Sequence, residues 1–426
     1  MKIVHIDNAD NGGGASRSAY RLHDGLRRLD ENSAMYVLNK RTKDPFVKRF
    51  QSSPGKVRWI SRNMRRLRLN LSMRRYDRSA PQDQTFFSED RTPFYLDSCR
   101  QIPESDVINL HWIANFLDLE AFFSWLPKNM PLVWTLHDMA AFTGGCCHAM
   151  DCAKFTEQCG ACPQLGSANE HDLSRDVWLR KQGYYSSLSN ERIHLVTPSQ
   201  WLGKELSRSA LLSKFPHSVI PYGLDLEVFQ PRDRALSREL LGIAKGAKVV
   251  LFVSNGLVHL KGFHILLDAL SGIDASNELF LLSIGLGSLP ALDRFQHTHI
   301  PSIGEDGLLS LIYSAADIFV LPSLADNLPN TMLESIACGT PVVASAVGGI
   351  PDTVRPGVTG LLVKTGDAAE LRSAILGLLG NDSLRTEMSA NCRKVALAEY
   401  SLELQARRYL EIYEGMLSAT RATRAS

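Results

Sequence analysis

Two acidic side chains, eight residues apart, flank a segment that can hold a phosphate group. Asp326 and Glu334 lie on either side of a predicted helix start near Asn330 and Thr331. The first backbone N–H groups of a helix lack partners within the helix and attract anions. A carboxylate accepts hydrogen bonds from hydroxyl groups. These residue types at this spacing predict a site for a ligand that carries both phosphate and hydroxyl groups.

The elements around this pair follow the order strand, loop, helix, strand. Ile318 to Leu321 is a short apolar run, typical of a buried parallel strand. Pro329 suits the first turn of a helix, and Gly339 suits its C-terminal cap. In open α/β sheets, ligands bind at the carboxyl ends of strands beside helix N-termini. The apolar side of the helix and the next strand would come from Met332, Leu333, Ile336, Ala337 and residues 341–344.

This stretch resembles the donor-binding signature of retaining glycosyltransferase family 4, whose members have the GT-B fold. That signature is an acidic residue, seven residues and a Glu, followed by Gly-x-Pro-Val-Val-Ala and Gly-Gly-x-Pro. The matching positions here are Asp326, Glu334, 339–344 and 348–351. The usual first acid is Glu, so Asp326 is a departure from the pattern.

The resemblance implies an α/β protein with two Rossmann-like domains that face a cleft. It implies a hexosyltransferase that moves a sugar, with retention, from a UDP- or GDP-linked donor to a glycan or lipid-linked acceptor. Cell-surface polysaccharide assembly is the implied setting, and no cofactor is required for catalysis. The catalytic residues would be His137, Lys261 and Asp326. The donor would contact Gly13, Gly14, Ser254, Asn255, Lys261, Asn327, Leu328, Pro329, Asn330, Thr331 and Glu334.

Two other functions stay open from the sequence, a GT-B sugar-nucleotide epimerase and a non-catalytic scaffold of a polysaccharide assembly complex. The family usually places an Arg and a Lys on the donor diphosphate. This chain keeps Lys261-Gly262 but has Asn255-Gly256 where the Arg is expected. The missing Arg favours the scaffold, whereas Lys261, Glu334 and His137 favour an enzyme.

Composition indicates a globular protein of two or three domains. The chain has 426 residues, 44% hydrophobic and 22% charged, with a net charge of +2. That charge argues against a general nucleic-acid binder. The opening residues 1–6 predict a strand rather than a secretory signal, and no apolar run is long enough to cross a bilayer. We therefore expect a cytoplasmic protein with reduced or metal-bound cysteines, working at the inner face of the cell membrane if its acceptor is lipid-linked.

A glycine-rich turn, Gly12-Gly13-Gly14, joins the first predicted strand to a helix that starts at Ser16. Its spacing is not the Gly-x-Gly-x-x-Gly of dinucleotide-binding domains, which disfavours a nicotinamide cofactor. The segment can be an ordinary turn. In the family a loop at this place lies in the cleft near the donor phosphates.

Two predicted strands end in histidine. The first leads to His111 and the second to His137-Asp138. The carboxyl ends of parallel strands meet at one sheet edge, so these side chains are expected together. His137-Asp138 also matches the His-Asp pair that family members carry at the cleft, and His111 and Asp138 are candidates for contact with the acceptor.

Five of the eight cysteines fall within 17 residues, inside a Cys-rich insert at 143–163. A subset of family 4 enzymes carries a similar insert after its His-Asp. Four thiolates can bind zinc in a closed, structural site. The alternative is a cluster of reduced thiols, or a disulfide formed on oxidation. The ligands would be Cys146, Cys152, Cys159 and Cys162, with Cys147 or His148 as a substitute for one of them.

Residues 56–78 contain nine Lys or Arg and a single acid. Ile60, Met64, Leu67 and Leu71 recur at helical spacing, with Trp59 beside them. Such a basic amphipathic helix can lie on an anionic membrane surface. Equally, its apolar side can pack on its own domain while its Arg side is solvated.

The expected domains are 1–222 for the acceptor and 235–400 for the nucleotide sugar, with 401–426 as a C-terminal helix and tail. Residues 41–104 show little sheet pattern and form an irregular region of the first domain. In the GT-B fold the last helix crosses back to the first domain.

Overall fold

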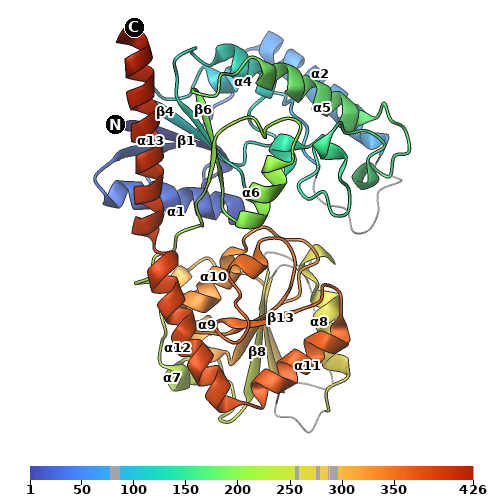
Figure 1. Ribbon diagram of the computed structural model, residues 1–426, viewed down its shortest axis with the longest axis vertical. Helices are drawn as coiled ribbons and strands as arrows, with labels where there is room; N and C mark the ends of the chain where they lie inside the picture. Colours follow the sequence, from blue (N-terminus) through green and yellow to red (C-terminus); the bar gives the residue numbers. More distant parts are fainter. Residues whose placement is uncertain (77–86, 255–258, 275–278, 286, 288–295, 426) are drawn as a thin grey trace. The chain divides into compact units, whose positions relative to one another are not determined.

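Two compact α/β units make up the chain, Met1–Ile220 with Gln405–Ser426, and Pro221–Leu404 (Figure 1). The computed structural model describes residues 1–76, 87–254, 259–274, 279–285, 287 and 296–425. Each unit is built on a parallel sheet. This architecture confirms the predicted α/β class with two Rossmann-like domains.

The described part of the first unit contains a seven-stranded parallel sheet with the order β3-β2-β1-β4-β5-β6-β7. Its strands are β1 (Lys2–Ala9), β2 (Asn32–Asn39), β3 (Val47–Arg49), β4 (Val107–Leu110), β5 (Leu132–Thr135), β6 (Ile193–Thr197) and β7 (His217–Val219). Its helices are α1 (Gly14–Arg28), α2 (Lys56–Arg74), α3 (Leu96–Cys99), α4 (Leu119–Trp125), α5 (Leu173–Ser186), α6 (Gln200–Ser207) and the C-terminal α13 (Leu402–Ala425).

The C-terminal helix α13 packs on the sheet of the first unit, as the fold prediction expected (Figure 1). Tyr409 and Tyr413 are fully buried. The Tyr413 hydroxyl accepts a hydrogen bond from Asn109 Nδ2 at 2.7 Å, and the Tyr409 hydroxyl lies 3.0 Å from Thr135 Oγ1. Because Asn109 and Thr135 belong to β4 and β5, these bonds fix the last helix to the middle of the sheet.

The second unit contains, in its described part, a six-stranded parallel sheet with the order β10-β9-β8-β11-β12-β13. Its strands are β8 (Lys248–Val253), β9 (Leu279–Ile284), β10 (Gln296–Ile300), β11 (Ile318–Leu321), β12 (Val342–Ser345) and β13 (Gly360–Val363). Its helices are α7 (Arg234–Leu240), α8 (Phe263–Ser271), α9 (Asp306–Ala315), α10 (Asn330–Ala337), α11 (Ala368–Leu379) and α12 (Asp382–Glu399).

Alternate side chains of β8 enter two separate apolar clusters. Val249 and Leu251 pack with α9 and α10, whereas Val250 and Phe252 pack with α8 and α11. A strand buried on both faces needs apolar residues at every position, which explains its unbroken hydrophobic run. The second sheet is therefore a rigid base for the loops at its carboxyl edge.

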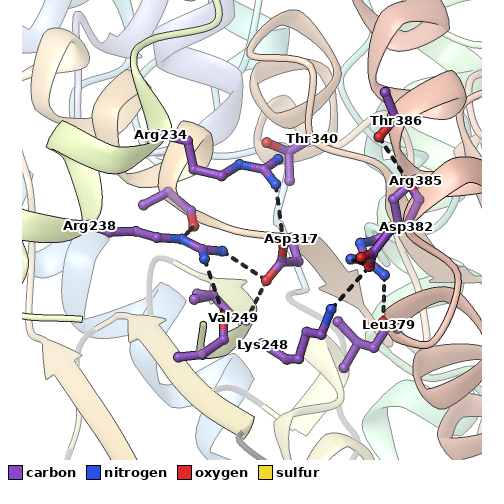
Figure 2. Close-up of polar contacts among 12 residues, drawn as sticks. Arg234, Arg238, Lys248, Val249, Asp317, Thr340, Leu379, Asp382, Arg385 and Thr386 are labelled. Carbon is purple, nitrogen blue, oxygen red and sulfur yellow. Dashed lines mark hydrogen bonds and ion pairs between the residues drawn. The ribbon is translucent and has the colours of Figure 1, made fainter. Parts of the chain in front are cut away.

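A buried carboxylate ties α7 to this sheet (Figure 2). Asp317, just before β11, accepts hydrogen bonds from Arg238 Nη2 at 2.8 Å, Arg234 Nη1 at 3.2 Å and the Val249 amide at 2.7 Å. At the same end of β8, Lys248 contacts Asp382, which also pairs with Arg385. Asp317 is buried and satisfied by three donors, so it helps hold β8 and β11 in register.

The region 41–104 is more regular than its sequence indicates. Within its described part, β3 extends the sheet edge, and α2 and α3 follow it. Among the described residues, no helix is both long enough and apolar enough to cross a membrane.

Candidate functional site

The start of α10 lies at the carboxyl end of β11, as the motif predicts. Pro329 is the N-cap residue, and no side chain of the described residues caps this helix. Leu328 and Asn330 are buried, and Thr331 is partly exposed. The preceding residue, Asn327, is buried, and its amide donates to Asp326 Oδ1 at 3.1 Å. Anions are stabilised at helix N-termini, so this end of the unit is able to accept a phosphate group.

Lys261 and Asp326 form an ion pair. The Lys261 ammonium donates to Asp326 Oδ2 at 2.6 Å, and Ser323 Oγ donates to the same oxygen at 3.3 Å. Lys261 follows the exit of β8 and Asp326 follows the exit of β11, which are neighbouring strands. Two of the three predicted catalytic residues are therefore brought together at one sheet edge.

Gly262 and Gly348 both pack tightly against the loop 322–326. Gly262 has φ +69°, and a Cβ there would lie 1.8 Å from the Pro322 carbonyl oxygen. Gly348 has φ +57°, and a Cβ there would lie 1.7 Å from the Asp326 carbonyl oxygen. No larger residue fits either position. These glycines position Lys261 and Asp326 through backbone packing.

Glu334 is fully buried in α10, and its Oε2 accepts a hydrogen bond from the Tyr313 hydroxyl at 3.0 Å. Tyr313 lies in α9 and is also fully buried. The sequence identifies Glu334 as a group for ribose hydroxyls but gives no sign of Tyr313. In this structure Tyr313 orients the carboxylate from 21 residues earlier in the chain.

The other predicted donor contacts divide between the units. Ser254 is buried directly after β8, in the second unit, whereas Asn255 lies outside the described residues. Gly13 and Gly14 are in the first unit, where Gly13 is the N-cap of α1. Gly12, beside them, has φ +107°, and a Cβ there would lie 1.7 Å from Arg41 Nη1. The φ of +107° favours glycine at this position, whereas the Arg41 side chain could move to make room.

Two buried histidines, His5 and His111, and the partly exposed His137 form a chain at the carboxyl edge of the first sheet. His137 Nε2 lies 3.1 Å from His111 Nδ1, and His111 Nε2 lies 2.9 Å from His5 Nδ1. His111 follows β4, His137 follows β5, and His5 is on β1 between its neighbours β2 and β4. The prediction that His111 and His137 lie together at the strand ends is confirmed, but the sequence analysis missed His5. The alternation of His5 and Asp7 on one face of β1 was the available signal.

Burial keeps this cluster uncharged. It lowers the pKa of His137 to about 3, and it holds those of His5 and His111 well below the ordinary value. Burial also raises the pKa of Asp7 to about 7, although Ala9, Ser16 and Trp112 donate hydrogen bonds to its carboxylate. Asp7, His111 and His137 each place a ligand atom within 4.8 Å of the others, so this group can also hold a metal ion.

A cavity of about 50 Å³ in the first unit lies beside His111 and His137. Asp138 lines it, accepting a hydrogen bond from Trp112 Nε1 at 3.1 Å. Lys181 lines it as well, and this buried ammonium donates to the carbonyls of Ala140 and Thr143. The mixture of indole, imidazole, carboxylate and ammonium groups suits a small polar molecule.

The four predicted zinc ligands surround one void of about 10 Å³, lined by Cys146, Cys152, Cys159 and Cys162. Cys159 Sγ accepts a hydrogen bond from the Gly144 amide at 3.1 Å. Burial raises the pKa of Cys146, Cys159 and Cys162, so these thiols are protonated at neutral pH. Among the described residues, no three of the four sulfur atoms lie within 4.8 Å of one another. The insert therefore gathers the four predicted ligands around one void, and zinc binding there stays a prediction.

Comparison with known proteins agrees with this fold. Residues 247–381 match the family described as glycosyl transferases group 1. D-inositol 3-phosphate glycosyltransferase from Geodermatophilus obscurus is 35% identical over 202 residues, which are 42% of this chain and 43% of that protein. The match therefore spans less than half the length of that relative.

Two solved structures are similar over almost the whole chain. Sucrose-phosphate synthase from Thermosynechococcus elongatus has a TM-score of 0.67 at 20% identity, covering 98% of this chain and 100% of that one. Anabaena HepE in complex with UDP and glucose has a TM-score of 0.64 at 17% identity, covering 97% and 99%. At these identities the similarity establishes the fold, which is that of GT-B glycosyltransferases.

Proposed function

We propose that the protein is a retaining hexosyltransferase that moves a sugar from a UDP- or GDP-linked donor to a glycan or lipid-linked acceptor. The observation that carries this proposal is the Lys261–Asp326 pair beside the start of α10, within the stretch that matches the glycosyltransferase family. The proposed setting is cell-surface polysaccharide assembly at the inner face of the membrane, which the family resemblance supports.

The chemistry requires positive charge on the departing diphosphate. The bond from the anomeric carbon to the phosphate oxygen breaks, a bond to the acceptor oxygen forms, and the acceptor proton passes to the leaving phosphate. The Lys261 ammonium and the N-terminus of α10 would stabilise the charge that develops on that phosphate. Glu334 would accept hydrogen bonds from the ribose, and Asn327 and Asp326 from sugar hydroxyls.

In the first unit, His137 is neutral and can donate or accept a hydrogen bond. It would orient a sugar or acceptor hydroxyl at the cavity that Asp138 also lines. Gly13 and Gly14 would let the ligand approach the backbone closely.

Calorimetric titration with UDP, GDP and their common sugar conjugates tests the donor site. Lys261→Ala should weaken binding of the preferred nucleotide about tenfold or more, as expected for a lost charge-assisted contact. Lys248→Ala is the matched control, because both lysines are 37% exposed and each pairs with one aspartate. Failure of every nucleotide to bind folded protein would overturn the proposal. Product formation with and without acceptor then separates a transferase from an epimerase.

A further inference from the structure

Helix α2 is packed on its unit by its polar side. Arg65 Nη2 donates to the buried Asp118 carboxylate at 2.5 Å, and its guanidinium also lies over the Tyr95 ring. Ser72 Oγ donates to Glu89 at 2.6 Å, about two turns further along the helix. No residue of α2 is fully buried. The helix is therefore held by hydrogen bonds, by an ion pair and by the partly buried Met73, which packs against the apolar cluster of Cys162, Leu165, Leu173 and Val177.

The apolar side of α2 faces away from the unit. Five apolar side chains and Trp59 are between 50% and 81% exposed, which excludes packing of this face on its own domain. At 100° per residue the five fall within about 80° of the helix circumference, and the centre of this set is about 100–120° away from Arg65 and Ser72. We name this set the α2 stripe: Val57, Ile60, Met64, Leu67 and Leu71.

Basic side chains border the α2 stripe: Arg68 and Arg75 lie on one side of it and Lys56 and Arg74 on the other, whereas Arg66 lies further round the helix. Lys56, Arg66, Arg68, Arg74 and Arg75 are exposed. Within the described chain, none of these five forms an ion pair with a carboxylate. Residues 56–76 contain no Asp or Glu at all. An apolar stripe edged only by cations matches a surface that is apolar inside and anionic at its face.

We propose that α2 docks this protein on an anionic lipid surface, with the α2 stripe in the headgroup–acyl boundary and the flanking Arg and Lys side chains on lipid phosphates. Long cationic side chains can extend along the apolar boundary to reach phosphates. Trp59 is 59% exposed on the same helix and has the amphipathic ring favoured at that depth. The docking itself is argued from α2 alone. The further conclusion that the acceptor is lipid-linked rests on the proposed function.

A second copy of the chain is a poorer occupant. Pairing two α2 stripes would bring ten cationic side chains together, five from each copy, with no acid on either helix to offset them. Like charges placed face to face oppose association. An anionic bilayer instead attracts each of these side chains, roughly additively.

Vesicle flotation tests the proposal on the full chain. Phosphatidylcholine vesicles with about one third phosphatidylglycerol should bind the wild type, and pure phosphatidylcholine vesicles should bind it far less. Arg68→Glu with Arg74→Glu, exposed residues on the two borders of the stripe, should lower binding about tenfold or more. The charge control is Arg100→Glu with Lys128→Glu, two exposed residues of the same unit whose reversal changes the net charge equally.

A second pair of variants removes apolar surface without touching the core. Ile60→Ala with Leu67→Ala should lower binding about tenfold, because both side chains enter the boundary. The control is Leu236→Ala with Leu240→Ala, exposed leucines on α7 of the other unit. Alanine favours the helix, so the circular dichroism spectra of these two double variants should match that of the wild type.

The proposal is overturned if wild-type protein fails to float with anionic vesicles at low salt, or if the controls lose as much binding as the α2 variants. A concentration-dependent dimer that Leu67→Ala dissolves would instead assign the stripe to a second copy. Nucleotide titration of the same samples keeps the two proposals apart. Vesicle binding without nucleotide binding would refute only the donor site, and the reverse result would refute only the docking.

Discussion

The Lys261 ammonium lies 2.6 Å from the Asp326 carboxylate, so the cation proposed for the donor diphosphate is already paired with the acid of the motif. A bound diphosphate would share that ammonium with Asp326 and would be repelled by the carboxylate. The Asp326 carboxylate and the diphosphate of the ligand would therefore compete for the Lys261 ammonium.

Neutralising Asp326 should consequently separate nucleotide binding from turnover. Asp326→Asn should tighten binding of the bare nucleoside diphosphate about fivefold, since a nearby repulsion of about 1 kcal/mol disappears. Turnover of the nucleotide sugar should fall, because a contact proposed for the sugar is lost. Calorimetry and initial rates measure the two effects. Asp382→Asn, which removes a carboxylate from the other end of β8, should change neither quantity, and equal effects of both variants would refute the competition.

Loss of Glu334 should weaken the donor complex. Glu334→Ala is expected to lose about 1.5–3 kcal/mol of donor binding, the range for hydrogen bonds to a charged group. Glu334→Gln keeps the side-chain shape for comparison, since Glu334 is fully buried. Tyr313→Phe removes the hydroxyl that orients the carboxylate and should cost less. Unchanged donor affinity and turnover in folded Glu334→Ala protein would end the assigned role.

Asp7 should make the first unit less stable as the pH rises. Its pKa is about 7 when folded and near 3.8 when unfolded, so the native state holds a proton that the unfolded state has lost. The contribution is complete below about pH 4 and disappears as the pH rises through 7, a change of about 4 kcal/mol. Asp7→Asn should remove this fall.

The fall in stability of the first unit can be measured by urea unfolding at several pH values. Tryptophan fluorescence reports on this unit, because all six tryptophans lie in it. The buried histidines act in the opposite sense, since their lowered pKa values cost stability as the pH falls. The quantity to compare is therefore the difference between variant and wild type. Asp176→Asn, an exposed site in the same unit, is the control. A difference that does not vary between pH 4 and 8 would show that Asp7 is ionised throughout.

The cysteine insert makes a prediction about metal content. Protein purified under reducing conditions without chelator should contain about one zinc per chain, and Cys159→Ser should lose it. Binding would draw the sulfur atoms closer than they lie in this structure and release thiol protons. Cys392→Ser, a buried thiol of the other unit, should keep the metal. Mass spectrometry of the metal content decides, and zinc-free wild-type protein would favour a cluster of reduced thiols.

Local patterns predicted the parts of the donor site that lie close in sequence. The apolar run before Pro322, the helix-compatible Pro329 and the cap at Gly339 were enough for β11 and α10. Contacts between distant segments could not be found this way. Tyr313 of α9 donates a hydrogen bond to Glu334 of α10. His5 lies within hydrogen-bond distance of His111 because β1 and β4 are paired strands. The spacing of its apolar residues identified α2 as amphipathic, but only the buried Asp118, 53 residues from Arg65, decides which side faces inward.

The final prediction concerns the buried carboxylate at the base of the second unit. Asp317→Ala leaves the Arg238 and Arg234 guanidinium groups and the Val249 amide without their common acceptor (Figure 2). Breaking a buried pair of this kind costs about 3–5 kcal/mol. Hydrogen exchange of the β8 and β11 amides should therefore rise strongly, while tryptophan fluorescence, confined to the first unit, should report the same unfolding midpoint as wild type. Asp382→Ala is the matched control in the same view, because its carboxylate is 78% exposed and its contacts are screened by water. Equal exchange in the two variants would mean that packing alone, without the Asp317 network, holds the two strands together.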